Sequence, residues 1–185
     1  LGNDHVKQVV KLNNRRFRKK QQLTIVEGVR EISRALENNI QPHEVYLCPE
    51  LIQEPAAQNI AAHFINNENS SAYKLFNVTP QVFEKIAYRG KSGGILLVIP
   101  IKNKQLEELH LGQPPFLAII EGVEKPGNLG GILRTADAAG VDCVIICGDK
   151  DQIETDIYNP NVIRASLGAL FSVPTISVDN GRLLP

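Results

Sequence analysis

Two hydrophobic periods alternate along the first hundred residues. Apolar side chains recur at helical spacing over residues 6–17, which predicts an amphipathic helix whose other face is basic. The same spacing follows Gly28 and Pro55, and Thr79 before Pro80 is typical of the start of a helix. Short apolar runs between the helices predict strands at residues 23–26, 45–47, 73–76 and 95–99. This alternation indicates a compact α/β module over residues 1–100.

Residues 101–115 interrupt the alternation. They are polar, with Gly112, Pro114 and Pro115 near their end, and are predicted to form a linker. Residues 116–120 are then a continuous apolar run, which is typical of a parallel strand covered on both faces. The predicted elements that follow are a loop over 121–128, a helix over 130–139 that ends at Gly140, a strand over 141–147, a helix starting at Asn159 and Pro160, and a strand over 175–178. Residues 116–185 are therefore predicted to form a second module, with a βαβ unit and a parallel sheet.

Positive charge is concentrated although the chain is neutral overall. Lysines and arginines number 20, as do aspartates and glutamates, so net charge gives no sign of attraction to a polyanion. Two stretches are nevertheless basic and are candidate RNA contacts: Arg15, Arg16, Arg18, Lys19 and Lys20 at the end of the first predicted helix and directly after it, and Arg89 and Lys91 in a later loop. For the first stretch taken alone, a solvated helix face explains the charges equally well.

Other side chains give little sign of chemistry. The three cysteines lack metal-ligand spacing and cannot all pair, and Cys143 and Cys147 lie in an apolar run, where cysteine behaves as a small core residue. The four histidines are scattered, so no metal site is expected. No apolar run approaches the ~20 residues that cross a bilayer, and the first residues do not resemble a signal peptide. A soluble protein of the reducing cytoplasm is expected.

A glycine-rich segment over residues 122–131 joins a strand to a helix, where backbone amides can approach a phosphate. It fits neither the Walker loop nor the G-x-G-x-x-G pattern of dinucleotide sites, so a generic nucleotide-binding domain is a weak alternative. Asn128 at the helix entry and Arg134, about 9 Å further along the axis, are the remaining polar candidates. By themselves, a capping residue and a solvated helix residue are the simpler interpretation.

The wider sequence changes that interpretation. Residues 126–136, Pro-Gly-Asn-Leu-Gly-Gly-Ile-Leu-Arg-Thr-Ala, resemble the first motif of the SpoU (TrmH-like) RNA ribose 2′-O-methyltransferases. Residues 164–169, Arg-Ala-Ser-Leu-Gly-Ala, resemble the second motif, in the family's order. Residues 15–31, with Gly93 and Gly94, are more loosely similar to the family's N-terminal substrate-binding domain, a ribosomal-protein-like α/β unit.

The resemblance implies a function and a set of site residues. Members transfer the methyl group of S-adenosylmethionine to a ribose 2′-hydroxyl of RNA, with a trefoil-knotted α/β fold and usually as homodimers. Asn128 and Arg134 take the catalytic positions, and Arg134 is expected to position the phosphate and hydroxyl, because a guanidinium with a pKa above ~12 is a poor base. The supporting motif residues are Glu121, Gly127, Gly130, Arg164, Ser166 and Gly168. The added N-terminal domain favours ribosomal RNA over transfer RNA.

The chain departs from the family in two places. Lys125 stands where an acidic or amide residue is frequent, and nothing after Val178 resembles the third motif, which forms the knot and most of the cofactor pocket. The chain is therefore expected to be C-terminally truncated and inactive alone, with the cofactor-binding residues unidentified. Exposed apolar sheet surface is expected as well. The alternative function is an RNA-binding α/β module without catalysis.

Overall fold

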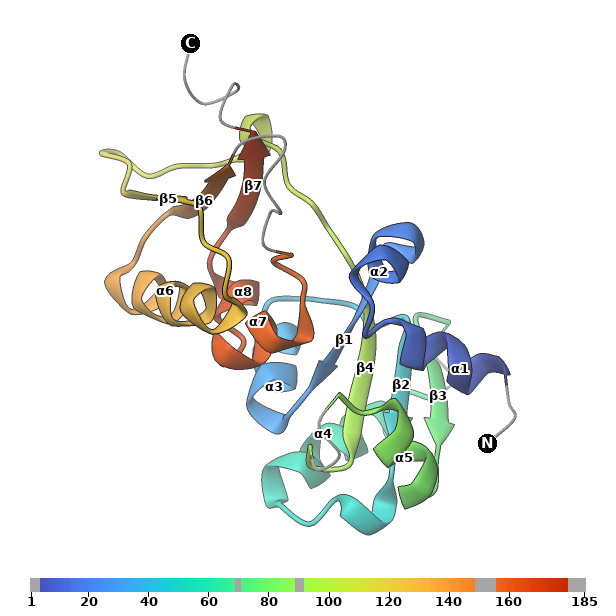
Figure 1. Cartoon of the computed structure of the whole chain (residues 1–185). Helices are drawn as coiled ribbons and strands as arrows, with labels where there is room; N and C mark the ends of the chain where they lie inside the picture. Colours follow the sequence, from blue (N-terminus) through green and yellow to red (C-terminus); the bar gives the residue numbers. More distant parts are fainter. Residues whose placement is uncertain (1–3, 69–70, 89–91, 149–155, 180–185) are drawn as a thin grey trace. The chain divides into compact units, whose positions relative to one another are not determined.

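Two separate sheets organise the chain, which a computed structural model describes over residues 4–68, 71–88, 92–148 and 156–179 (Figure 1). The chain divides into two compact units, residues 1–101 and 102–185. Both units combine helices with a sheet. In the described parts of the chain, no helix is both long enough and apolar enough to cross a membrane.

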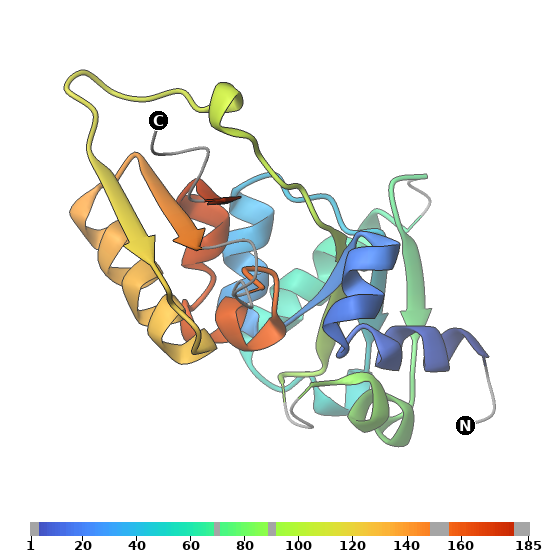
Figure 2. The same ribbon diagram turned by 45° about the horizontal axis from the view of Figure 1, so that its top comes forward.

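The first unit contains a mixed sheet in the order β1-β4-β2-β3. Its strands are β1 (Leu23–Glu27), β2 (Glu44–Leu47), β3 (Lys74–Asn77) and β4 (Ile95–Pro100). Strand β4 runs antiparallel to β1 and β2, whereas β2 and β3 are parallel. The first five residues of β4 are buried because helices cover both faces of the sheet. One face carries α1 (Asp4–Lys11) and α5 (Pro80–Ile86), and the other carries α3 (Val29–Glu37) and α4 (Pro55–Asn66) (Figure 2).

The N-terminal helix is divided. The single helix predicted over residues 6–17 is wrong, because the structure has α1 and then α2 (Arg15–Gln21) with a turn between them. Asn14 is extended, with φ −93° and ψ 127°. Its Oδ1 accepts hydrogen bonds from the amides of Arg16 at 2.9 Å and Phe17 at 3.4 Å. This side chain satisfies two amides that a new helix leaves open, which favours a second start at this position.

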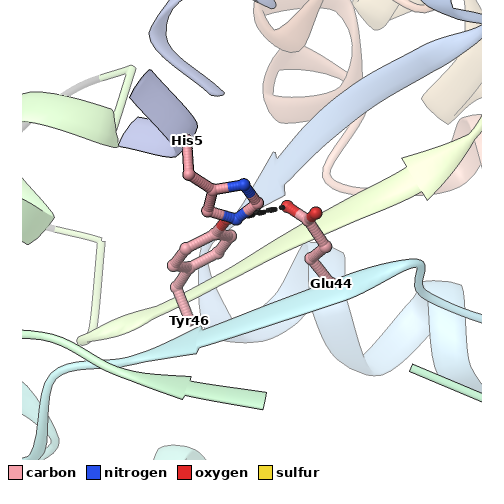
Figure 3. A network of polar contacts seen from close by, with 3 residues as sticks. All are labelled: His5, Glu44 and Tyr46. Carbon is pink, nitrogen blue, oxygen red and sulfur yellow. Dashed lines mark hydrogen bonds and ion pairs between the residues drawn. The ribbon is translucent and has the colours of Figure 1, made fainter. Parts of the chain in front are cut away.

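A polar network joins α1 to β2 in the first unit, as Figure 3 shows. The hydroxyl of Tyr46 donates to Glu44 Oε2 at 2.7 Å. His5 Nε2 lies 2.8 Å from that hydroxyl and 3.5 Å from Glu44 Oε2, and the His5 ring lies 5.0 Å from the ring of Phe76. Burial of Tyr46, together with its hydrogen bond to Glu44, raises the pKa of the phenol. His5 therefore has a carboxylate partner that its isolated place in the sequence does not reveal.

The second unit contains a parallel sheet in the order β5-β6-β7. The strands are β5 (Leu117–Glu121), β6 (Cys143–Gly148) and β7 (Thr175–Asp179), and the helices are α6 (Pro126–Ala139), α7 (Pro160–Ala165) and α8 (Ala169–Ser172). Helix α6 joins the parallel neighbours β5 and β6, so the predicted βαβ unit is confirmed. Asn159 caps α7 by accepting a hydrogen bond from the amide of Asn161 at 2.9 Å, as its position before Pro160 predicts.

The two faces of the second sheet are covered unequally. Leu106 and Leu109, from the segment predicted as a linker, pack against a cluster that contains Cys143 and Ile145. Strand β6 is buried except for the half-buried Cys147, but Ile119 in β5 is 58% exposed. The prediction that residues 116–120 are covered on both faces is therefore wrong, because β5 lies at the edge of the sheet.

Candidate functional site

Helix α6, which carries the first motif, begins earlier than its sequence predicts. Pro126 is its first residue and Lys125 is the N-cap, so the predicted loop over residues 121–128 ends three residues sooner. Proline suits this position because its φ is already helical and it has no amide to leave unpaired. Asn128 is the third residue of the helix, and its amide donates to the carbonyl of Lys125 at 3.0 Å. Asn128 is therefore not a capping residue.

Asn128 and Arg134 both lie on the exposed side of α6. At about 100° per residue they are separated by about 120° around the helix and about 9 Å along it. Between these two directions lie Gly127 and Gly131, where an added Cβ would meet nothing within 4 Å. No hydrogen bond joins the two polar side chains in the described structure. The helix thus presents an amide and a guanidinium on either side of a strip without side chains.

The electrostatic surroundings of this strip favour an anionic group. It lies on the first half of α6, whose N-terminus carries partial positive charge. Arg134 adds a full charge and Lys125 a second one, and the first turn contains no acidic residue, although the exposed Glu124 directly before Lys125 offsets one of these charges. Glu121, the last residue of β5, is exposed at the carboxyl edge of the parallel strands, where open α/β sheets bind ligands.

The opposite side of α6 explains other motif residues as packing residues. An added Cβ at Gly130 would lie 2.4 Å from Cβ of Ala165 and 2.8 Å from the amide nitrogen of Ser166, so α7 approaches the bare backbone of α6. Ser166 is fully buried, and its hydroxyl donates to the carbonyl of Ile163 at 2.8 Å. Gly168 has a φ of +80°, which glycine adopts without strain. The structure therefore brings Gly130 and Ser166 together at a helix contact.

Two further side chains complete the surroundings of α6. Arg164 is exposed in the last turn of α7, directly before the residue that contacts Gly130. The hydroxyl of Ser172 in α8 donates to Oδ1 of Asp137 at 2.8 Å. The link between Ser172 and Asp137 has no signal in the sequence, because 35 residues separate the partners.

Neither thiol of β6 is prepared for nucleophilic chemistry. Burial raises the pKa of the Cys143 thiol, and burial followed by the charge of Glu121 raises the pKa of the Cys147 thiol. A raised pKa keeps a thiol protonated, whereas the thiolate is the nucleophile. The described residues also contain no group of three or more histidine, cysteine, aspartate or glutamate side chains that could hold a metal ion.

The basic residues of the first unit divide into two kinds. Four of the five cations of α2 are exposed: Arg15, Arg16, Lys19 and Lys20. Arg18 is only 2% exposed, and its Nη1 donates to the carbonyl of Leu12 at 2.7 Å. The assignment of Arg18 to the RNA-contacting set is therefore corrected, because its guanidinium joins α2 to the end of α1. Arg89 and Lys91 lie outside the described residues.

Comparison with known proteins gives the same division of the chain. Residues 3–97 match the MRM3-like substrate binding domain, and residues 115–183 match the SpoU rRNA Methylase family. The 23S rRNA (guanosine-2′-O-)-methyltransferase RlmB of Haemophilus ducreyi is 42% identical over 94 residues, which are 48% of this chain and 36% of that protein. A putative TrmH family tRNA/rRNA methyltransferase of Staphylococcus epidermidis is 33% identical over 135 residues, which are 70% of this chain and 53% of that protein.

Solved structures share the fold over nearly the whole chain. The crystal structure of an RNA 2′-O ribose methyltransferase superposes with a TM-score of 0.77 at 31% identity, covering 99% of this chain and 66% of that one. The SpoU methyltransferase AviRb from Streptomyces viridochromogenes, in complex with AdoMet, gives a TM-score of 0.82 at 23% identity, covering 98% of this chain and 66% of that one. The chain spans about half or less of the length of the two curated relatives above. It belongs to the SpoU rRNA methylase family, with an MRM3-like substrate binding domain ahead of its methylase part.

Proposed function

We propose that the intact protein transfers a methyl group from S-adenosylmethionine to a ribose 2′-hydroxyl of RNA, and that its substrate is ribosomal rather than transfer RNA. The exposed side of α6 carries this proposal, because Asn128 and Arg134 flank an open glycine strip within the segment that matches the methylase family. The relative from Haemophilus ducreyi is named for 23S rRNA, and AviRb was solved with AdoMet, which supports both the substrate and the cofactor.

The two polar residues have different roles in this proposal. The guanidinium of Arg134 is planar and stays charged, so it binds the phosphate beside the target ribose through two parallel hydrogen bonds. Asn128 offers an amide donor and acceptor on the other side of the strip, where a ribose hydroxyl requires both. The missing side chains at Gly127 and Gly131 leave room for the sugar against the helix backbone. When bound, S-adenosylmethionine supplies the electrophilic methyl group.

Arg134→Lys in the intact protein tests this role. Lysine keeps the charge but removes the fork, so about one charge-assisted hydrogen bond of 1.5–3 kcal/mol is lost, and kcat/KM should fall roughly 10- to 160-fold. Transfer of radiolabelled methyl groups to rRNA measures the change. Arg30→Lys, an exposed arginine of the first unit, is the control and should leave turnover unchanged. Turnover of Arg134→Lys near that of the parent would contradict the proposal.

A homodimer and a cytoplasmic location also belong to the proposal. The family resemblance supports the homodimer, and sedimentation equilibrium of the intact protein tests it. The three free cysteines support a reducing compartment. Fractionation of cells that express the intact protein tests the location.

A non-catalytic RNA-binding module is the second candidate, and the exposed cations of α2 favour it. Methyl transfer separates the two candidates. An intact protein that binds rRNA tightly but transfers no methyl group in the presence of S-adenosylmethionine would support the second candidate over the first.

A further inference from the structure

The exposed cations of α2 form a surface that local helix stability does not explain. Arg15, Arg16, Lys19 and Lys20, named here the α2 basic face, lie within a sector of about 140° at about 100° per residue. Two pairs of like charge stand at i,i+4 spacing, Arg15 with Lys19 and Arg16 with Lys20, which is unfavourable by roughly 0.2–0.5 kcal/mol per pair. Arg15 and Arg16 also oppose the positive end of the helix dipole, and no acidic residue occupies the first turn.

The neighbouring cations Lys7 and Lys11, unlike those of the α2 basic face, have partners among the described residues. Lys7 pairs with Asp4 at 2.8 Å, and Lys11 lies over the ring of Phe17, 5.8 Å from its centroid. The α2 basic face makes no ion pair within the described part of the chain. A solvated helix face normally mixes both signs of charge. Four unpaired charges on seven residues of a chain with equal numbers of cations and anions therefore indicate an anionic partner.

The α2 basic face is held in place before any partner binds. The buried guanidinium of Arg18 donates to Leu12, and Asn14 caps α2, so both ends of the turn between the helices are fixed. Helix α1 is itself attached through its buried residues Val6 and Val9 and through the contact of His5 with the Tyr46 hydroxyl. Little backbone conformational entropy therefore remains to be lost on binding, which favours affinity.

We propose that the α2 basic face binds the phosphate backbone of structured RNA without reading its sequence; this inference rests on the RNA substrate proposed above. Sequence readout in RNA uses unstacked bases on aromatic rings. The aromatic residue of α2, Phe17, is half-buried and covered by Lys11, so the face offers charges but no stacking surface. Phosphate contacts of this kind fix the position of a substrate, and another part of the protein must select the nucleotide.

The salt dependence of RNA binding measures the number of phosphate contacts. Four contacts contribute a slope of about −2.8 to −3.6 in log K against log salt, which is a loss of affinity of roughly 50- to 150-fold between 50 and 200 mM salt. The variant Arg15→Gln, Arg16→Gln, Lys19→Gln, Lys20→Gln of the 185-residue chain should lose this contribution. Fluorescence anisotropy with a hairpin RNA and with a hairpin of shuffled sequence measures both affinity and slope.

Two controls accompany this variant. Lys7→Gln with Lys11→Gln removes two partnered cations nearby and should leave the slope within about 0.5 of the parent. Arg15→Lys with Arg16→Lys keeps the charges and should keep affinity within a few fold. Circular dichroism confirms that each variant folds.

Four results would overturn the inference. A folded quadruple variant with the parental slope excludes the face as the phosphate contact, and a large preference for one hairpin excludes sequence-independent binding. Tighter binding to anionic phosphatidylserine vesicles than to RNA would show that the partner of the α2 basic face is a membrane surface and not RNA. If the parent chain binds neither hairpin at 50 mM salt, RNA is not the partner of the α2 basic face. The proposed RNA substrate then also loses this support. If methyl transfer by the intact protein fails while the slope changes as expected, only the catalytic proposal falls.

Discussion

Adjacent glycines in α6 should respond to the same substitution in opposite directions. At Gly130, an added Cβ would lie 2.4 Å from Cβ of Ala165, 2.6 Å from its carbonyl carbon and 2.8 Å from the amide nitrogen of Ser166. Ordinary carbon contacts are about 3.5–4.0 Å, so α6 and α7 would have to separate by about 1 Å or more. Two of the three atoms are backbone, so no side-chain rotation relieves the overlap.

The magnitude follows from two opposing effects. Overpacking of this kind typically costs about 1–3 kcal/mol, and the backbone contacts place Gly130→Ala at the upper end. Replacing glycine by alanine inside a helix stabilises the helix by roughly 0.5–1 kcal/mol, which offsets part of this cost. The expected loss in free energy of unfolding is therefore about 2 kcal/mol. At Gly131, where nothing lies within 4 Å, only the favourable effect remains, so Gly131→Ala should stabilise by roughly 0.5–1 kcal/mol.

Calorimetry and hydrogen exchange together test this pair. For a unit of this size, about 2 kcal/mol corresponds to a decrease in Tm of about 8–16 °C in Gly130→Ala. Hydrogen exchange of peptides from α6 and α7 assigns the change to the helix contact. A Gly130→Ala variant as stable as the parent, or as stable as Gly131→Ala, would refute the close approach of the two helices.

Two further predictions concern the first unit. Asn14→Ala should lower the free energy of unfolding by about 1 kcal/mol, because two amides of α2 lose their acceptor. Thr79→Ala is the control and should change it little, because the side chain of this cap residue makes no capping hydrogen bond. Urea unfolding compares the two variants, and equal losses would contradict the capping role of Asn14. The pKa of the Tyr46 phenol is raised above its ordinary value of 10.0, so above pH 10 the unfolded chain releases this proton while the folded chain keeps it. The free energy of unfolding is therefore unaffected by this group below pH 10 and decreases above pH 10, by up to about 1.4 kcal/mol per pH unit. Urea unfolding from pH 8 to 11 should show this decline in the parent and a shallower one in Tyr46→Phe, and equal declines would refute it.

Much of the fold could be predicted from local sequence. The βαβ unit follows from two apolar runs and a helical period between them, and Gly140 ends α6 in the left-handed region, as glycine at that position predicts. The candidate pair Asn128 and Arg134 was found through the motif string, and the structure places both on one exposed side of a helix. Such features depend on neighbours within a few residues, so periodicity and motif spacing are enough to find them.

Other features needed contacts between distant segments. From the sequence, the five cations of α2 are equivalent. In the structure Arg18 is buried against the end of α1, whereas the other four are exposed. Gly130 and Gly131 are equivalent in a glycine-rich string until α7 packs against one of them and leaves the other open.

The sequence by itself thus determined the order of the elements, the family motifs and the candidate residues, because helical and strand periods are local properties of the chain. Only the tertiary structure decided which residues serve packing and which face a partner. Ile119 has the apolar character of a core residue but is exposed at a sheet edge, and His5 finds Glu44 and Tyr46 about 40 positions away. The physical reason is that burial and partnership depend on which surfaces meet when distant segments pack, and no single stretch of sequence contains that information.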